Sequence, residues 1–225
     1  MIDFNELISN YLKREFRPKD IGRYYPSEAG NCLRKSWYSY KIPRDVGIEL
    51  IKIFEVGNIL HEFIADVLKS EKNPHVELLG KEVPFRLELD NFIVSGRIDD
   101  IISVKVDDKI YLVEMKSTSS INATTKPNYS HILQLQLYMH FKKINDGIIL
   151  YIEKNTLQSK WFHVKYDNRI AEEAIVRFDA LHRYLVAEKT PEPEARKDPM
   201  MRWQCDKCQY REECYKETPK SEEYP

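Results

Sequence analysis

The sequence predicts a mixed α/β fold, and three observations point to it. Residues 92–105 and 109–116 alternate apolar and polar side chains, as strands do, whereas residues 48–70 and 129–144 repeat at helical period. The predicted order is helix, several strands, helix, strand, without the regular alternation of a doubly wound nucleotide-binding fold. Only 7 of the 225 residues are Gly, and no Gly-rich phosphate-binding loop is present.

The helices are predicted from apolar spacing. The first stretch, MIDFNELISNYLKREF, is amphipathic, and the strongest pattern is an apolar stripe at i, i+3, i+4 and i+7 within residues 48–70. The stripe consists of Val56, Ile59, Leu60, Phe63, Ile64, Val67 and Leu68. Further helices are expected over 129–144 and 167–187.

The strands are predicted from alternation and from Ile and Val content. Residues 75–89 look extended, and short strands are expected at 147–152 and 160–165. Asp107-Asp108 is the expected two-residue turn between the strands at 92–105 and 109–116.

We expect three regions: an N-terminal helical part at 1–47, a core at 48–189, and a linker with a cysteine segment at 190–225. The linker TPEPEARKDPM is broken by Pro, and the polar tail SEEYP is expected to fray.

Composition limits the class of protein. The formal net charge of −1 excludes a histone-like basic protein, although a local basic patch can still bind nucleic acid. The charged N-terminal stretch is unlike a signal peptide, and no run approaches the roughly 18 apolar residues of a membrane span. We therefore expect a cytoplasmic protein with no membrane partner, whose cysteines stay reduced.

Two segments place carboxylates and a lysine on one strand face. In YLVEMKST, Glu114 and Lys116 point one way, and Val113 and Met115 the other. A two-residue turn would set Asp99 of SGRIDDI opposite Lys116 and on the same face as Glu114. Two carboxylates suit Mg²⁺ or Mn²⁺, and the lysine could orient or deprotonate a water. The alternative is a hairpin with ordinary surface charges.

Other polar residues could join this cluster. His131, Gln134 and Tyr138 share one face of the helix at 129–144, although the row could equally be solvated. His61, in GNILH, lies at the edge of the apolar stripe, where a lone histidine is more often a surface or core-edge residue than a ligand.

Four cysteines suggest a second site. Cys205, Cys208 and Cys214 form C-x-x-C-x₅-C, and Cys32 lies far upstream. Four thiolates can bind Zn²⁺ or an iron–sulfur cluster, but Cys32 has no second cysteine near it, as a zinc ribbon would need. Three cysteines within ten polar residues do not resemble an apolar core of unrelated thiols.

Basic and aromatic residues alternate after Cys32. Such a mixture suits single-stranded nucleic acid, through phosphate pairing and base stacking. The alternative is a helix whose aromatic side chains pack on the cysteine lobe, and a combination would put Trp37 inside and Arg34 or Lys35 outside. The residues are Arg34, Lys35, Trp37, Tyr38, Tyr40, Lys41 and Arg44.

The motifs GNILH, GRID, EMK and HILQLQLY, in this order and at this spacing, resemble the RecB-like branch of the PD-(D/E)XK nuclease superfamily. The chain looks most similar to the CRISPR-associated RecB-like exonucleases, the fourth Cas family. The resemblance implies a restriction-endonuclease-like core with an iron–sulfur lobe formed by the N- and C-terminal segments. One departure is Ile98, which stands where the superfamily nominally has Pro.

The resemblance also implies roles for individual residues. His61, Asp99 and Glu114 would bind Mn²⁺ or Mg²⁺, with the backbone carbonyl of Met115 as a further ligand. Lys116 would be catalytic, and Gln134 and Tyr138 would match the supporting Q-x-x-x-Y element. Cys32, Cys205, Cys208 and Cys214 would hold a [4Fe–4S] cluster, with [2Fe–2S] or zinc as alternatives.

The implied activity is 5′-to-3′ exonuclease action on single-stranded DNA, with endonuclease activity as a further option. The implied role is to trim DNA before its integration into CRISPR arrays, in partnership with integrase proteins of a prokaryote. Two alternatives remain open: a stand-alone repair or viral nuclease, and a non-catalytic module that hands DNA to an integrase.

Overall fold

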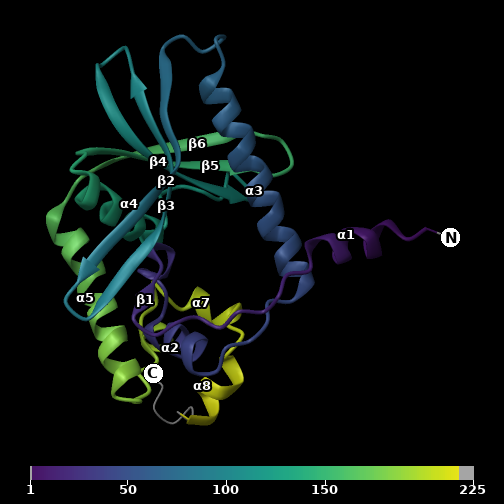
Figure 1. Ribbon diagram of the computed structural model, residues 1–225, viewed down its shortest axis with the longest axis vertical. Coiled ribbons are helices and arrows are strands. Elements are labelled where there is room, and N and C mark those ends of the chain that lie inside the picture. The colour runs from purple at the N-terminus through teal and green to yellow at the C-terminus, as the bar shows by residue number, and fades with distance from the viewer. Residues whose placement is uncertain (1, 218–225) are drawn as a thin grey trace.

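The computed structural model describes residues 2–217, which form one sheet with helices on both faces (Figure 1). The tail SEEYP therefore lies outside the described residues. Within the described residues, no helix has the length and apolar character that crossing a membrane requires. The predicted mixed α/β class is confirmed.

The sheet contains six strands. The order is β1-β3-β4-β5-β6, with β2 paired to the other edge of β3. β4 and β5 are parallel because a helix returns the chain between them, whereas β2–β3, β3–β4 and β5–β6 are antiparallel. The strands are β1 (Arg23–Tyr24), β2 (Val76–Leu89), β3 (Phe92–Val104), β4 (Lys109–Thr118), β5 (Asp146–Glu153) and β6 (Ser159–Lys165).

One edge of β3 is shared by two partners. β1 pairs in parallel with Ile93 and Val94, and β4 pairs only with Asp100–Val104. Between these ladders, residues 95–99 have no strand partner on that edge within the described chain. The sheet therefore forks at Asp99, where β3 and β4 separate.

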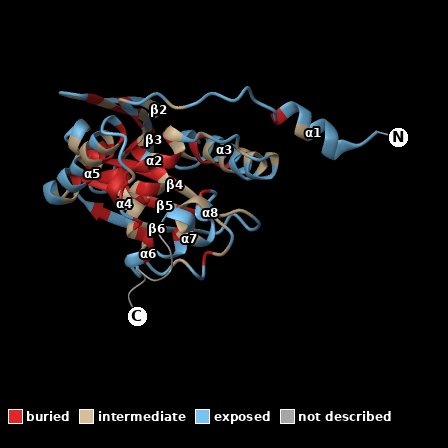
Figure 2. Ribbon diagram, turned by 90° about the horizontal axis from the view of Figure 1, so that it is seen from below, coloured by how far each residue is buried: buried red, intermediate tan, exposed pale blue. Residues whose placement is uncertain are grey.

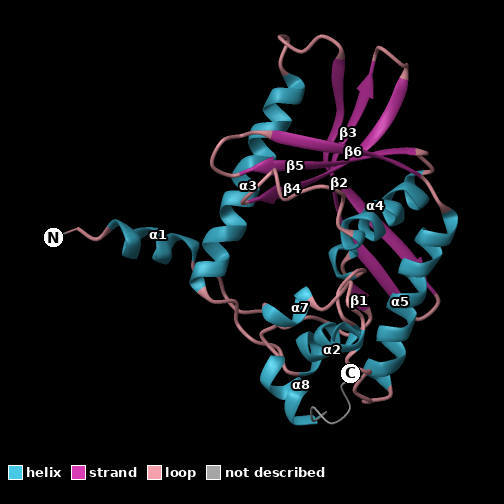
Figure 3. Ribbon diagram, turned by 180° about the vertical axis from the view of Figure 1, so that it is seen from behind, coloured by secondary structure: helices cyan, strands magenta, loops and turns pink. Residues whose placement is uncertain are grey.

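Helices cover the sheet unequally. α4 (Tyr129–Lys142) and α5 (Asn168–Val186) pack together on one face, over the largest apolar core, and α3 (Ile48–Lys69) crosses the other face (Figures 1 and 3). Leu60 and Ile64 of α3 contact Met115 and Ile152 in a smaller cluster. Because successive strand residues alternate faces, Glu114 and Lys116 face away from α3.

A lobe lies beyond the sheet, where the segment around α2 meets the C-terminal helices (Figure 1). It contains η1 (Pro26–Glu28), α2 (Leu33–Lys41), α6 (Glu194–Lys197), α7 (Trp203–Asp206) and α8 (Arg211–Glu217). The predicted linker at 190–200 thus includes a short helix. α1 (Phe4–Leu12) projects from the body and is almost entirely exposed (Figure 2).

The expected two-residue turn at Asp107-Asp108 is wrong. Val104 pairs with Lys109, so four residues connect the strands, and Asp99 comes level with Glu114 instead of Lys116. The favoured two-residue hairpin turns need positive φ at their first position, and of the two Asp residues only Asp108 has it, at φ 52°. The register differs by two residues, which is the strand period, so each side chain keeps its predicted face.

Candidate active site

Asp99 stands at the fork of the sheet. Its Oδ2 accepts a hydrogen bond from the backbone N–H of Met115 at 2.8 Å. The carboxylate thus bonds to β4 just beyond the last ladder pair, Asp100–Val113, where β3 and β4 part. The strand geometry therefore fixes this carboxylate beside Glu114.

Glu114 and Lys116 form an ion pair on β4. The Lys116 Nζ lies 2.5 Å from Glu114 Oε1, and the Glu114 side chain is 1% exposed. Glu114 Oε2 is buried without a hydrogen-bond partner among the described residues. The structure thus brings Asp99, Glu114 and Lys116 together, as the strand period predicted.

His61 reaches the same place from α3. Its Nδ1 lies 3.6 Å from Asp99 Oδ2, and its side chain is 27% exposed. Burial lowers the pKa of His61, which favours the neutral imidazole that a metal ligand requires. Met115 lies between Glu114 and Lys116, with its side chain buried against α3.

Gln134 and Tyr138 are buried, so a solvated polar row on α4 is wrong. Gln134 Nε2 donates to Tyr138 Oη at 3.1 Å, and Tyr138 Oη donates to the backbone carbonyl of Arg97 at 2.9 Å. This chain of hydrogen bonds fixes α4 to β3 two residues before Asp99. Gly96, just before Arg97, packs closely on Pro26, since an added Cβ there would lie 3.0 Å from the Pro26 Cδ.

Tyr151 is a site residue that the sequence analysis missed. It is the β5 neighbour of Lys116, and its Oη lies 2.8 Å from His131 Nδ1. Because Tyr151 Oη accepts from the Asn128 N–H at 3.0 Å, its own proton is available to His131. No local signal marks Tyr151, because its role depends on the pairing of β5 with β4.

Two largely buried carboxylates that lie close together shift the pKa values of the candidate site. Burial and the Asp99 charge raise the pKa of Glu114 to about 7, and burial raises the pKa of Asp99 to about 7. Burial acts to lower the pKa of Lys116, but Glu114 and Asp99 outweigh it and raise that pKa. Burial and the nearby Lys116 lower the pKa of His131 to about 3. The site therefore favours an added cation.

The donor set fits a divalent cation in its chemistry. Buried carboxylate oxygens are the hard ligands that Mg²⁺ and Mn²⁺ prefer, and Glu114 Oε2 is an orphaned oxygen of this kind. Across residues 2–217, however, no group of three or more His, Cys, Asp or Glu side chains is already arranged to hold a metal ion.

The four cysteines come together in the lobe. Cys32, Cys205, Cys208 and Cys214 line one cavity of about 20 Å³, although Cys32 is far from the others in sequence. Burial and the neighbouring thiols raise the pKa of Cys205, and burial raises that of Cys208. A shared site is thus compatible with the positions of all four.

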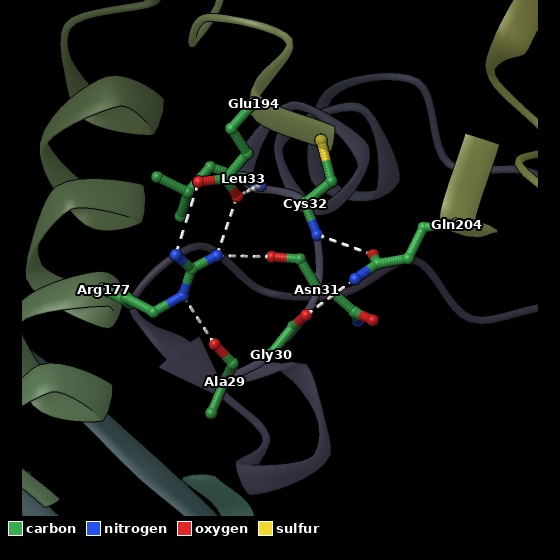
Figure 4. A network of polar contacts seen from close by, with 8 residues as sticks. All are labelled: Ala29, Gly30, Asn31, Cys32, Leu33, Arg177, Glu194 and Gln204. Carbon is green, nitrogen blue, oxygen red and sulfur yellow. Dashed lines mark hydrogen bonds and ion pairs between the residues drawn. The ribbon is translucent and has the colours of Figure 1, made fainter. Parts of the chain in front are cut away.

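Hydrogen bonds with three other side chains hold the Cys32 loop in place (Figure 4). Arg177 of α5 donates to the carbonyls of Ala29 and Asn31 and pairs with Glu194, which accepts from the Leu33 N–H. Gln204, 172 positions from Cys32, accepts from the Cys32 N–H and donates to the Gly30 carbonyl. We call these three side chains, Arg177, Glu194 and Gln204, the loop clamp.

The two residues predicted to contact DNA lie on α2. Arg34 is 6% exposed and donates to the Pro191 carbonyl at 2.5 Å, so it is not placed to meet a phosphate. Lys35 is half-buried and lines the cysteine cavity. Trp37, expected inside, is half-buried and donates to the Tyr184 carbonyl at 3.3 Å.

Two acidic residues and a lysine thus lie on adjacent strands, with a glutamine–tyrosine pair behind them. The profile of the PD-(D/E)XK nuclease superfamily matches residues 26–215. The chain therefore belongs to the PD-(D/E)XK nuclease superfamily.

Solved structures share the fold at low sequence identity. The crystal structure of SSO0001 is 18% identical, covers 98% of this chain and 95% of its own, and has a TM-score of 0.60. A phage-related exonuclease from Haemophilus somnus 129PT is 14% identical, with a TM-score of 0.51, over 74% of this chain and 96% of its own. No curated protein sequence matches this chain.

Proposed function

We propose that the protein is a divalent-metal-dependent DNA exonuclease with its reactive centre at the fork of β3 and β4. The observation that carries the proposal is the juxtaposition of Asp99, buried Glu114 and Lys116, with His61 approaching from α3. The fold it shares with a phage-related exonuclease supports the same activity.

Each residue of the proposed site has its own role in the reaction. Asp99 and Glu114, with His61 and the Met115 carbonyl, would hold Mg²⁺ or Mn²⁺, which when bound polarises a phosphoryl oxygen and acidifies a water. Lys116 orients that water and offsets charge that builds on the phosphate. Gln134 and Tyr138 fix α4 to β3 and so hold the site against the strands.

We extend the proposal to the substrate and role that the motifs imply. The enzyme degrades single-stranded DNA from the 5′ end and trims DNA for a CRISPR integrase in a prokaryotic cytoplasm. The four cysteines lining one cavity support a [4Fe–4S] cluster there, with [2Fe–2S] or zinc as alternatives. A brown protein with broad visible absorption would identify the cluster, since zinc is colourless.

The test is digestion of single-stranded DNA labelled at one end or the other, with Mn²⁺ or EDTA. We expect early release of short products from the 5′-labelled strand, none in EDTA, and none from Lys116→Ala, which should still bind DNA. Lys160→Ala, an exposed lysine on β6, is the matched control. Binding without cleavage by the wild-type protein would instead identify a non-catalytic DNA-recognition module.

A further inference from the structure

A groove of about 350 Å³ lies between α3, the segment that follows α1, and the cysteine lobe. Figure 1 shows that segment running from the lower end of α3 across to β1, next to the lobe. We call it the arginine–aromatic groove, after the residues that the argument uses. They are Arg14, Phe16, Arg17, Arg44, Phe54 and Asn58.

The groove leads along α3 toward the active site. Phe54, Asn58 and His61 are spaced by four and three residues, so they share one face of the helix. At about 1.5 Å of rise per residue, Asn58 is about 4.5 Å and Phe54 about 10.5 Å along the axis from His61. A strand bound in the groove would therefore extend directly to the proposed metal ligands.

The charges of the groove favour a polyanion. Basic side chains outnumber acidic ones in its lining, with Arg14, Arg17, Lys19 and Arg44 against Glu15 and Asp45. Arg14 pairs with Glu55 at 3.5 Å and Arg17 with Glu15 at 3.0 Å, and the two arginine side chains are 69% and 83% exposed. Exposed pairs of this kind contribute little, so a phosphate can replace either carboxylate at small cost.

The other two basic side chains of the lining, Lys19 and Arg44, form part of the groove wall. Arg44 pairs with Glu213, donates to the Gln209 carbonyl, and lies over the Tyr210 ring. Lys19 pairs with buried Glu28. These contacts connect the groove wall to the cysteine lobe and leave Arg14 and Arg17 as the cations available to a ligand.

Two exposed aromatic rings favour single-stranded over double-stranded nucleic acid. Phe16 is 44% exposed and Phe54 is 53% exposed, on opposite segments of a charged groove. Exposed rings beside arginines bind unpaired bases by stacking, whereas the bases of a duplex are already stacked on each other. We infer that the arginine–aromatic groove binds single-stranded DNA and guides it to the active site, an inference that rests on the proposed nuclease function.

The test is fluorescence anisotropy with a labelled oligothymidylate of roughly 20 nucleotides, longer than the roughly 4–16 nucleotides that a single OB fold covers. Binding is measured in EDTA, which prevents cleavage, across a salt series. Phe16→Ala and Phe54→Ala should each weaken binding by about fivefold or more. Arg14→Ala with Arg17→Ala should flatten the salt slope by about 1.4, since two phosphate contacts are lost.

Matched controls lie on distant elements. Arg169 and Arg183 of α5 are 89% and 70% exposed and also form exposed ion pairs, so their double alanine variant controls for lost charge. Trp161→Ala, on β6, controls for loss of an exposed ring. Thermal denaturation confirms that each variant is folded.

Each outcome decides the inference. Groove variants that bind like the controls, or a wild-type protein that binds no single strand, would overturn it. An equal loss on a blunt duplex would overturn the preference for single strands. A wild-type protein that binds the oligonucleotide through the groove but cuts no DNA with Mn²⁺ would keep the groove as a single-strand binding site. It would remove the proposed nuclease function and, with it, the guiding of DNA to an active site.

Discussion

Glu114 shows how burial prepares a carboxylate for a cation. Its charge lies beside that of Asp99, with Lys116 paired to it, and one oxygen has no partner among the described residues. The raised pKa values mean that the folded protein retains protons that the unfolded chain releases. Metal-free protein should therefore lose stability as pH rises from about 4 to about 7.

The corresponding prediction combines pH and metal. Urea denaturation in EDTA should show a lower free energy of unfolding at pH 8 than at pH 5, by up to about 1.4 kcal/mol per pH unit for each carboxyl. Mn²⁺ should raise stability at pH 8 more than at pH 5, because protons compete for the same oxygens. Glu114→Gln should lose most of the Mn²⁺ effect, and an unchanged Mn²⁺ effect in that variant would contradict the assignment.

The residues of the site differ in how far local pattern can identify them. Asp99, Glu114 and Lys116 follow from strand alternation, which a two-residue register change does not disturb. Tyr151 depends on the parallel pairing of β5 with β4, which no local pattern shows. Arg34 was expected outside, but α2 buries the face that carries it against the C-terminal segment.

At the scale of elements, periodicity predicted the long helices and strands to within one or two residues. It predicted neither the four-residue β3–β4 connection nor the short β1 and η1, because these depend on backbone conformation and tertiary contact. Periodicity also could not predict the fork of the sheet, because the fork arises where β1 and β4 share one edge of β3.

The backbone conformation of the β3–β4 connection predicts how substitutions there change stability. Asp108 adopts a left-handed conformation, with φ 52°, which Gly accepts more readily and Val resists. Asp108→Gly should be neutral or stabilising by up to about 1 kcal/mol, and Asp108→Val should destabilise by about 1–2 kcal/mol. Thermal denaturation measures both, and Lys105→Val, in the same connection at negative φ, is the control. Equal losses in the two valine variants would contradict the strain argument.

At the scale of the whole molecule, the loop clamp joins the C-terminal segment to the Cys32 loop through side chains other than the cysteines. Arg177 contacts both the Cys32 loop and Glu194, and it is half-buried between them. We therefore expect Arg177→Ala to expose residues 190–217 to trypsin, and Cys208→Ala to expose them less. Arg183→Ala, on the same helix, is the control. Limited proteolysis measures this, and a Cys208 variant that is cut as fast as the Arg177 variant would show that the thiols dominate.

The loop clamp also has a consequence for biosynthesis. Cys32 emerges from the ribosome well before Gln204, which lies 172 positions further along the chain, and before the other three cysteines. The sheet and the helices that pack on it can form while the chain is still growing, since domains fold as their residues become available. The lobe cannot close until residues 204–214 have been made, so any metal or cluster bound by all four thiols would enter a protein whose sheet and packed helices can already have formed.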